Sequence, residues 1–279
     1  MSVRGFILQP TYRIHNGRPV VHLYGRLESG EPFLVTDERQ TPCFYVAAGD
    51  AERAALAGAE SVDFVDKTTL DGRGVARVDV RVPADAPPLR QRLAAQGVNC
   101  YEADVRFAMR YLIDRGVRGA AEIRGEARDS PGIGRVFVNP ELAPAAWKPE
   151  LAVLSFDVET DPRARRLLSI ALHGRGGAAD VSEVLLFCPQ DLKAPPGAVP
   201  FAKEADLLRA FCDRVREIDP DVLTGWNVVD FDFRVLDRMA RAWGVRLELG
   251  RGPGTLRLRD SRFPWATLEA LVPGRVVLD

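Results

Sequence analysis

The sequence has few cysteines and no long apolar run. Its four cysteines show neither CxxC nor Cys/His spacing, which argues against a zinc site and against a disulfide framework. No apolar run approaches the roughly 20 residues that a membrane helix needs. The N-terminal segment MSVRGFILQPTYR lacks the small-residue cleavage site of a signal peptide. These absences predict a cytoplasmic protein with no membrane partner.

The sequence also lacks an excess of charge of either sign. Its 279 residues carry 38 Lys and Arg against 39 Asp and Glu, for a net charge of −1. Residues 1–145 hold 19 basic and 19 acidic side chains, which leaves 19 and 20 for the remainder. Nonspecific binding to duplex DNA through many phosphate contacts is therefore not expected. Nucleic acid held locally in a small cleft is compatible with this balance.

The first half of the chain has the pattern of a small α+β domain over residues 1–145. Short stretches rich in strand-forming residues are separated by turn dipeptides, and helices are expected at residues 87–96 and near 104–113. The expected strands include Gly5–Gln9, Val20–Arg26, Pro32–Thr36 and Cys43–Val46. Prolines at positions 140, 144 and 149 surround Ala145-Ala146-Trp147. This linker-like composition predicts a domain boundary near residue 145.

The second half predicts an α/β domain over residues 146–279. The run LAVLSFDV at Leu151–Val158 is typical of a strand buried on both faces. Two further strands that can pair with it as a meander are followed by helix, strand and helix, an order that indicates a mixed sheet. The expected elements are strands at Leu167–His173 and Val184–Cys188, a helix over Lys203–Ile218, a strand at Val222–Thr224 and a helix from about Asp230 to Trp243.

Two carboxylates lie near the end of the first strand of this domain. Asp157 and Glu159 are two residues apart, which places them on one face of a strand about 6.6 Å apart along the chain. Two like charges side by side are costly to desolvate unless a cation compensates them. Carboxylate oxygens suit Mg²⁺ or Mn²⁺. The alternative is a solvated strand end that is acidic by chance.

A third carboxylate, Asp232, continues the apolar stripe of the last helix. Counting back from Trp243 through Met239 and Leu236 reaches it in steps of three to four, so we expect it to face the sheet. The alternative is an acidic residue in a first turn that complements the helix dipole. If Asp157, Glu159 and Asp232 converge on metal, the domain can hydrolyse phosphodiesters by a two-metal mechanism.

Two segments resemble the exonuclease motifs of the family B DNA polymerases. FDVET at residues 156–160 resembles the first motif, and DPDVLTGWNVVDFD at residues 219–232 resembles the second. The opening GFILQPTYRI, YEADVR at residues 101–106 and residues 227–236 are similar to bacterial members of this family. The resemblance covers the whole chain. It implies an N-terminal domain followed by a ribonuclease-H-like 3′→5′ exonuclease domain.

The resemblance also implies the residues of the site. Asp157, Glu159 and Asp232 match the catalytic, metal-binding carboxylates, which hold two Mg²⁺ or Mn²⁺ ions. Asn227 and Phe231 match positions that line the single-stranded 3′ end of DNA. Phe231 can stack on a frayed base or can pack in the core, and both alternatives stay open. The arginines at 163, 165 and 166 could meet phosphates or form a solvated turn.

The family's third exonuclease motif, Tyr-x-x-x-Asp, and its polymerase motifs are absent, since the last tyrosine is Tyr111. We therefore expect an N-terminal fragment of a DNA-directed DNA polymerase with 3′→5′ proofreading, inactive by itself. Its partners in the intact protein are a template-primer and, through a missing C-terminal region, a sliding clamp. Two alternatives are a free-standing exonuclease of the same superfamily and a catalytically silent nucleic-acid-binding module.

Overall fold

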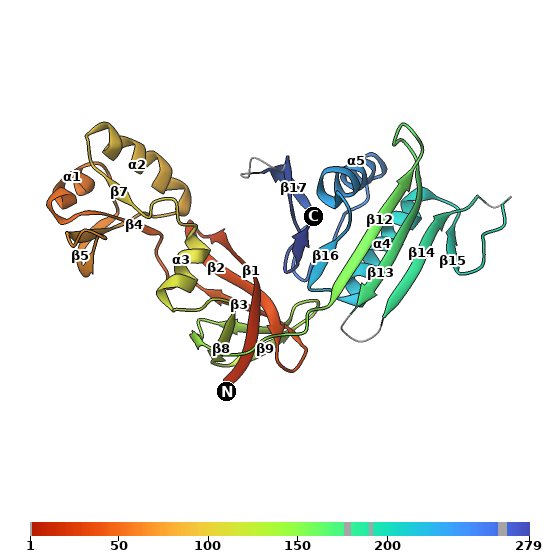
Figure 1. The fold of residues 1–279 in the computed structure, drawn as a ribbon, viewed down its shortest axis with the longest axis horizontal. Coiled ribbons are helices and arrows are strands. Elements are labelled where there is room, and N and C mark those ends of the chain that lie inside the picture. Colours follow the sequence, from red (N-terminus) through yellow and green to blue (C-terminus); the bar gives the residue numbers. More distant parts are fainter. Residues whose placement is uncertain (1, 176–179, 190–191, 262–266) are drawn as a thin grey trace. The chain divides into compact units, whose positions relative to one another are not determined.

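The computed structural model describes residues 2–175, 180–189, 192–261 and 267–279 (Figure 1). The chain divides into two compact units. The first comprises Met1–Leu23, Leu34–Arg128 and Val136–Ala146, and the second comprises Tyr24–Phe33, Asp129–Arg135 and Trp147–Asp279. Sheets dominate both units and helices accompany them, so the predicted mixture of α and β structure is confirmed. No helix among the described residues is long and apolar enough to cross a membrane.

The N-terminal strands form a seven-stranded sheet with the order β11-β8-β1-β2-β3-β10-β9. Strand β8 pairs antiparallel with both β1 and β11. Helix α3 (Phe107–Asp114) contacts β1, where the rings of Tyr12 and Phe107 meet edge to face with centroids 5.6 Å apart. The strands are β1 (Ser2–His15), β2 (Arg18–Leu27), β3 (Pro32–Asp37), β8 (Ala120–Arg124), β9 (Ala127–Ser130), β10 (Gly134–Val138) and β11 (Glu141–Pro144).

A smaller sheet in the first unit has the order β5-β6-β4-β7. Helix α2 (Ala86–Ala95) has prolines in its first turn, where a missing N–H costs nothing. Its Leu89 and Leu93, one turn apart, are buried with Phe44 and Val78 of the sheet in one apolar core. The other elements are β4 (Cys43–Ala47), α1 (Ala51–Leu56), β5 (Ser61–Thr68), β6 (Gly74–Asp79) and β7 (Cys100–Tyr101).

The second unit contains a six-stranded mixed sheet with the order β15-β14-β13-β12-β16-β19. Strands β12, β13 and β14 pair antiparallel as the predicted meander, whereas β12 pairs parallel with β16 and β16 pairs parallel with β19. A separate pair, β17–β18, is antiparallel. The strands are β12 (Val153–Thr160), β13 (Leu167–Arg175), β14 (Val181–Phe187), β15 (Ala198–Phe201), β16 (Val222–Thr224), β17 (Arg257–Asp260), β18 (Leu268–Leu271) and β19 (Val276–Leu278).

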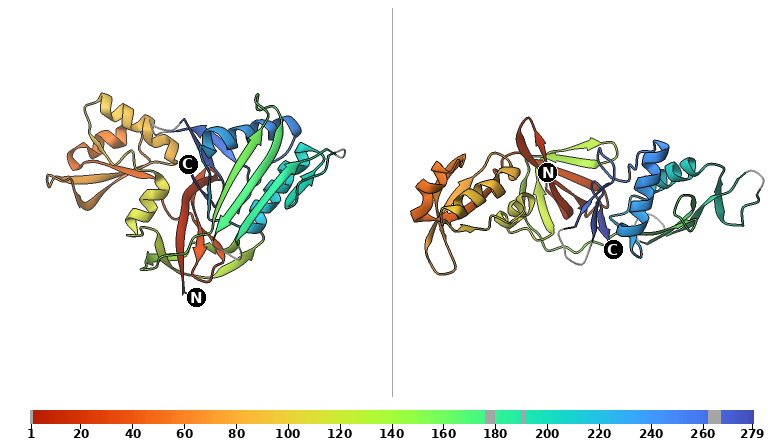
Figure 2. Two further views of the ribbon diagram at one scale, coloured as in Figure 1. Left: turned by 45° about the vertical axis from the view of Figure 1, so that its right-hand side comes forward. Right: turned by 90° about the horizontal axis from the view of Figure 1, so that it is seen from above.

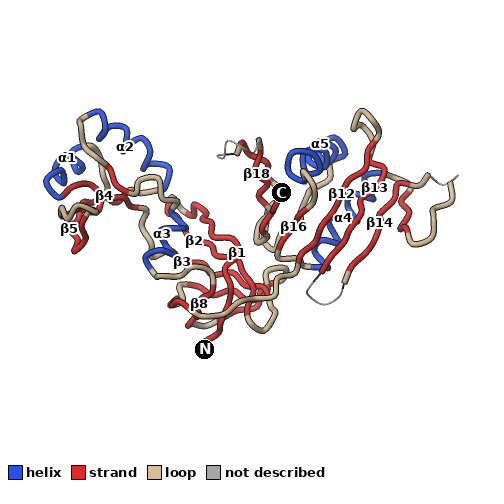
Figure 3. Tube along the Cα trace, viewed as in Figure 1, coloured by secondary structure: helices blue, strands red, loops and turns tan. Residues whose placement is uncertain are grey.

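Helices α4 (Glu204–Ile218) and α5 (Arg234–Trp243) pack on this sheet and share its core (Figures 2 and 3). Phe156 of β12 lies between Phe211 of α4 and Phe233, with ring centroids 5.2 and 5.0 Å away. The apolar stripe of α4 supplies Leu207, Leu208, Phe211, Cys212 and Val215. Burial of these side chains, at roughly 1.5–3 kcal/mol each, holds the helices on the strand that carries the candidate acids.

The expectation that this strand is buried on both faces is wrong for β12. Leu154, Phe156 and Val158 are buried, while Asp157 and Glu159 are exposed. The helices cover the face that carries Phe156, and the acids lie on the opposite one because side chains alternate along a strand. The apolar run therefore indicated the strand correctly but not the environment of its second face.

Candidate active site

Asp157 and Glu159 lie on the exposed face of β12, next to its C-terminal end. Their neighbours across the antiparallel pair are Ala171 and Ser169 of β13. The register shifts between Glu159 and Thr160, so regular pairing stops directly after the second acid. The sequence expectation that the two carboxylates share one face of a strand is met by the structure.

Asp232 comes from a different element and faces the sheet. It is only 1% exposed, and its Oδ1 accepts a 2.8 Å hydrogen bond from the backbone N–H of Val158. Val158 stands between Asp157 and Glu159 in the strand. The carboxylate of Asp232 is therefore anchored to the backbone that carries the other two acids, as its helical spacing with Met239 predicted.

The local backbone around Asp232 differs from the single helix that the sequence predicts. Residues Val228–Phe233 form a π-helical segment, η3, which continues directly into α5. Asn227 precedes it with a left-handed φ of 54°, a conformation that asparagine tolerates better than most residues. Single π-turns inside α-helices are rare, and those that occur are often found at functional sites. Neither feature is visible in the apolar periodicity.

The end of β16 explains why a carboxylate can reach Val158. Strand β16 pairs with β12 only over Val153–Ser155, and the chain then turns through Gly225. A Cβ at Gly225 would lie 2.5 Å from the carbonyl oxygen of Phe156, so the turn can pass this close to β12 only because position 225 has no side chain. Beyond Ser155, Asp232 supplies the acceptor that a neighbouring strand would otherwise provide.

The electrostatics of Asp232 reflect this burial. Desolvation raises the pKa of its carboxyl to about 6, and the negative charges of Asp157 and Asp279 act in the same direction, while the hydrogen bond from Val158 opposes the shift. A buried carboxyl with acidic neighbours is stabilised when a proton or a cation neutralises it.

Asp279 is a carboxylate that the sequence analysis missed. Its Oδ1 accepts a 2.7 Å hydrogen bond from the backbone N–H of Val228, the first residue of η3. It follows β19, whose Leu278 pairs with Thr224 of β16. No local sequence signal points to it, because the contact joins segments 51 residues apart.

The two predicted substrate-binding residues border this site. Phe231 is 40% exposed and Asn227 is exposed as well, so the alternative that Phe231 only packs in the core is wrong. The carbonyl of Asn227 accepts a hydrogen bond from the N–H of Phe231 at 3.0 Å, but within the described residues no side-chain hydrogen bond involves Asn227. Trp226, which the sequence analysis did not single out, is 92% exposed.

The donor chemistry of the three acids suits a hard divalent cation. Their geometry in this structure does not complete a site: among the described residues, no group of three or more His, Cys, Asp or Glu side chains is placed to hold a metal ion. Asp157 and Glu159 point from the exposed face of β12, whereas Asp232 is buried at the strand's edge. The predicted convergence on one cation is therefore not seen.

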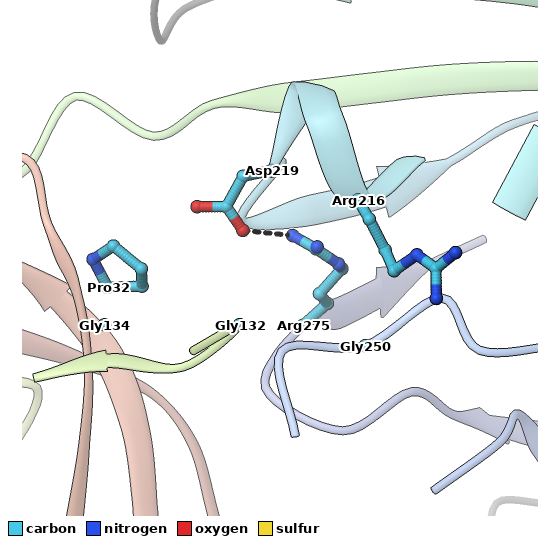
Figure 4. Close-up of a pocket in the computed structure, with 7 residues that line it drawn as sticks. All are labelled: Pro32, Gly132, Gly134, Arg216, Asp219, Gly250 and Arg275. Atoms are coloured by element: carbon cyan, nitrogen blue, oxygen red, sulfur yellow. Dashed lines mark hydrogen bonds and ion pairs between the residues drawn. The ribbon is translucent and has the colours of Figure 1, made fainter. Parts of the chain in front are cut away.

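A pocket of about 240 Å³ in the second unit does not contain these residues (Figure 4). It lies beside Asp219 and Arg275, where Asp221 accepts a backbone hydrogen bond from Ala152. Ala152 precedes β12, and six residues of extended strand place it about 20 Å from Val158. The pocket is lined by Pro32, Gly132, Gly134, Arg216, Asp219, Gly250 and Arg275.

Buried ion pairs fix this opposite end of the sheet. Helix α4 ends at Ile218, and the next residue, Asp219, has a left-handed φ of 49° and is followed by Pro220, a combination that stops a helix. Burial favours the neutral form of Asp219, but Arg251, Arg275 and Arg26 hold its pKa below the usual range. Asp221 is fully buried and accepts hydrogen bonds from Arg26 at 2.7 Å and Arg251 at 2.8 Å.

Comparisons with known proteins give a consistent result. Residues 98–257 match the family model for the exonuclease domain of DNA polymerase family B. The chain is 32% identical to DNA polymerase II of Escherichia coli (strain K12) over 100% of this chain and 35% of that protein. It is 28% identical to a DNA polymerase of Thermococcus sp. (strain 9oN-7) over 88% of this chain and 30% of that protein.

The structure is similar to that of the family B DNA polymerase from the hyperthermophilic archaeon Pyrobaculum calidifontis. The TM-score is 0.75 at 28% sequence identity, and the match covers 99% of this chain and 36% of the other. The chain thus spans about a third of the length of the relatives it matches.

Proposed function

Because this chain belongs to the family B DNA polymerases, we propose that it forms the N-terminal part of a DNA-directed DNA polymerase that excises mispaired 3′ ends. The observation that carries the proposal is the bond from Val158 to Asp232. It ties the acid of the second exonuclease-like segment to the strand that carries Asp157 and Glu159. In the intact protein a template-primer occupies the polymerase, and a sliding clamp docks through a C-terminal region. We place the protein in the cytoplasm.

We assign the catalytic and metal-binding roles to Asp157, Glu159 and Asp232. Exonuclease domains of this family are metal-dependent, and we propose two Mg²⁺ or Mn²⁺ ions. When bound, such ions generate hydroxide from water and stabilise the leaving 3′ oxygen. The contribution of the chain is to hold three carboxylates around one backbone segment, and the raised pKa of Asp232 means that a cation nearby would stabilise its charged form.

Asn227 and Phe231 position the single-stranded 3′ end in this proposal. The exposed ring of Phe231 offers a face on which a frayed base can stack. The side-chain amide of Asn227, free of protein partners in the described chain, can donate to and accept from the nucleotide. Asn227 precedes η3 and Phe231 lies within it, so the strand end would be held beside Asp232 of the same segment.

The 279-residue chain by itself should turn over DNA slowly or not at all. It has no Tyr-x-x-x-Asp segment, and its described acids do not complete a cation site. We propose that a further carboxylate, supplied by the third exonuclease motif of the intact protein, completes the site. We also propose that the boundary between the N-terminal domain and the exonuclease domain lies near residue 145.

The test is Mn²⁺ binding to the chain by isothermal titration calorimetry, together with digestion of a single-stranded oligonucleotide. Wild type should bind Mn²⁺ weakly, and Asp232→Ala should lose that binding. Asp213→Ala, which removes an exposed acid of α4, should not. Binding that is equal in all three proteins would contradict the metal assignment. Rapid digestion that Asp157→Ala abolishes would contradict the inactivity of the isolated chain.

One observation favours a second function. Because the described acids form no complete cation site, the chain could act as a catalytically silent nucleic-acid-binding module. In that case single-stranded DNA would bind in the absence of metal, and Mn²⁺ would leave the thermal stability of wild type unchanged. A shift of the melting temperature with Mn²⁺ that Asp232→Ala removes would exclude the silent module.

A further inference from the structure

The turn between β12 and β13 carries three arginines directly after the candidate acids. One of them is engaged within the protein: Nε of Arg166 donates to Glu204 at 2.8 Å, and its guanidinium lies 4.9 Å from the ring centre of Phe187. Arg163 and Arg165 are exposed, and neither forms an ion pair with any residue that the structure describes. Two of the three guanidinium groups are therefore available to a ligand.

The turn is held in one conformation by Asp161. Its Oδ1 accepts hydrogen bonds from the backbone N–H groups of Arg165 and Arg166 at 2.5 and 2.7 Å. The carbonyl of Asp161 also accepts from the N–H of Ala164 at 2.8 Å. Through these hydrogen bonds the Asp161 carboxylate orders the backbone of the turn, so the arginine side chains extend from a fixed backbone.

Helix α5 adds a third cation to this surface. A guanidinium nitrogen of Arg238 donates to the carbonyl of Ala164, which joins the helix to the turn, and Figure 1 shows the two side by side. Arginine has five N–H donors, so this contact leaves most of the exposed guanidinium group unused. The acids near Arg238 have other partners, since Asp230 pairs with Arg234 and Asp237 pairs with Arg241.

We propose that Arg163, Arg165 and Arg238 form a phosphate-binding track for the single strand whose 3′ end enters the site. The inference rests on the proposed function and adds the residues that hold the strand's backbone. The track lies next to Glu159 in sequence, and α5 continues from η3, which carries the exposed Phe231. Cations that follow the backbone, combined with an aromatic face for a base, are the usual means of holding single-stranded nucleic acid.

The acids of the site give such a track a physical role. Asp157, Glu159 and Asp232 repel a phosphodiester, and bound metal offsets this only at the scissile group. Guanidinium groups bind phosphate through paired N–H donors. Three of them beside the acids would compensate the repulsion along the neighbouring phosphates.

The experiment measures binding of a fluorescein-labelled oligo(dT) by anisotropy, in EDTA so that no digestion occurs, over about 50–200 mM salt. The track variant changes Arg163, Arg165 and Arg238 to Gln. The matched control changes the exposed arginines Arg175, Arg209 and Arg246 of the same unit to Gln, which removes the same charge. Arg175 lies at the opposite end of the β12–β13 pair, across from Val153.

The track variant should bind about tenfold more weakly than the control. Each phosphate contact on a single strand contributes about 0.7 to the slope of log affinity against log salt, so the slope should become less steep by about 2. Replacing the same three residues with Lys should keep the slope. Equal affinity and slope in the track variant and the control would overturn the track alone. Absence of binding by wild type would overturn the proposed function as well.

Discussion

The carboxylate of Asp232 accepts a 2.8 Å hydrogen bond from the backbone of Val158, the residue between Asp157 and Glu159. The bond joins two segments 74 residues apart and fixes a buried acid at the edge of the strand that carries two exposed ones. The carboxylate of Asp232 therefore has two roles. One is to satisfy a backbone N–H that no strand pairs, and the other is to contribute negative charge to the site.

The charge of Asp232 should make the protein less stable as the pH rises. Burial raises its pKa in the folded state from the usual 3.8 to about 6, so the folded protein favours the protonated form. The resulting stabilisation is full below about pH 4 and is lost as the pH rises through 6. We expect Asp232→Asn, which keeps an acceptor for Val158, to remove this dependence.

At pH 8 the Asp232→Asn variant should be more stable than wild type by on the order of 2 kcal/mol. Urea unfolding between pH 4 and 8, without divalent metal, measures the difference. A variant that is less stable than wild type at pH 8 would show that the hydrogen bond depends on the charge of Asp232.

Asp279 should control the start of η3. In Asp279→Ala the N–H of Val228 loses its acceptor, and leaving a buried donor unpaired costs about 1–3 kcal/mol. Hydrogen exchange of the Val228 amide should then accelerate about tenfold or more, because local opening becomes easier. Asp279→Asn keeps an acceptor and should protect the amide. The amide of Val222, which donates to Ala152, is the internal reference and should exchange alike in all three proteins.

Truncation to Ala should mainly weaken DNA binding at Phe231 and mainly destabilise the fold at Phe233. Phe231 is 40% exposed, so Phe231→Ala should change the free energy of unfolding by less than about 0.5 kcal/mol while it weakens oligo(dT) binding by about 1–3 kcal/mol. Phe233 is fully buried against Phe156, and Phe233→Ala should destabilise the protein by about 3–5 kcal/mol. Chemical denaturation and anisotropy separate the two effects. Unchanged DNA binding by Phe231→Ala would remove the stacking role.

The buried ion pairs at the other end of the sheet should contribute far more to the free energy of unfolding than ion pairs on the surface. Asp221→Ala leaves Arg251 and Arg26 with fewer acidic partners in a buried place, which should cost about 3–5 kcal/mol. The matched control is Asp206→Ala, because Asp206 and Arg209 are both 53% exposed and such pairs contribute about 0–1 kcal/mol. Equal midpoints of urea unfolding in the two variants would contradict this reading of the cluster.

The sequence predicts those parts of the fold whose pattern is local and periodic. Alternation or helical spacing predicts the meander of β12, β13 and β14 and the helices α4 and α5. Helical spacing also predicts that Asp232 faces the sheet. The short strands β17 and β18, by contrast, carry charged residues in four-residue segments. They pair with each other and are close in sequence, but segments this short and this charged give no recognisable strand pattern.

For the candidate site, the sequence predicts residues but not their arrangement. The motif segments supplied Asp157, Glu159 and Asp232, but the π-helical form of η3 and the bond from Asp279 to Val228 depend on how β16 and β19 are placed. The same holds for Arg26 and Asp221, which meet across 195 residues. Long-range ion pairs of this kind leave no periodic trace, since a single charged residue at each end is enough.

The close approach at Gly225 has a consequence for how this segment can vary. The spacing between the turn and β12 is set by a main-chain oxygen, that of Phe156, which no substitution removes. Neighbouring Trp226 projects into solvent and bears none of this constraint. A substitution at position 226 can therefore change an exposed side chain while the close approach of the turn to β12 is kept, which separates variation at this surface from the backbone geometry beside it.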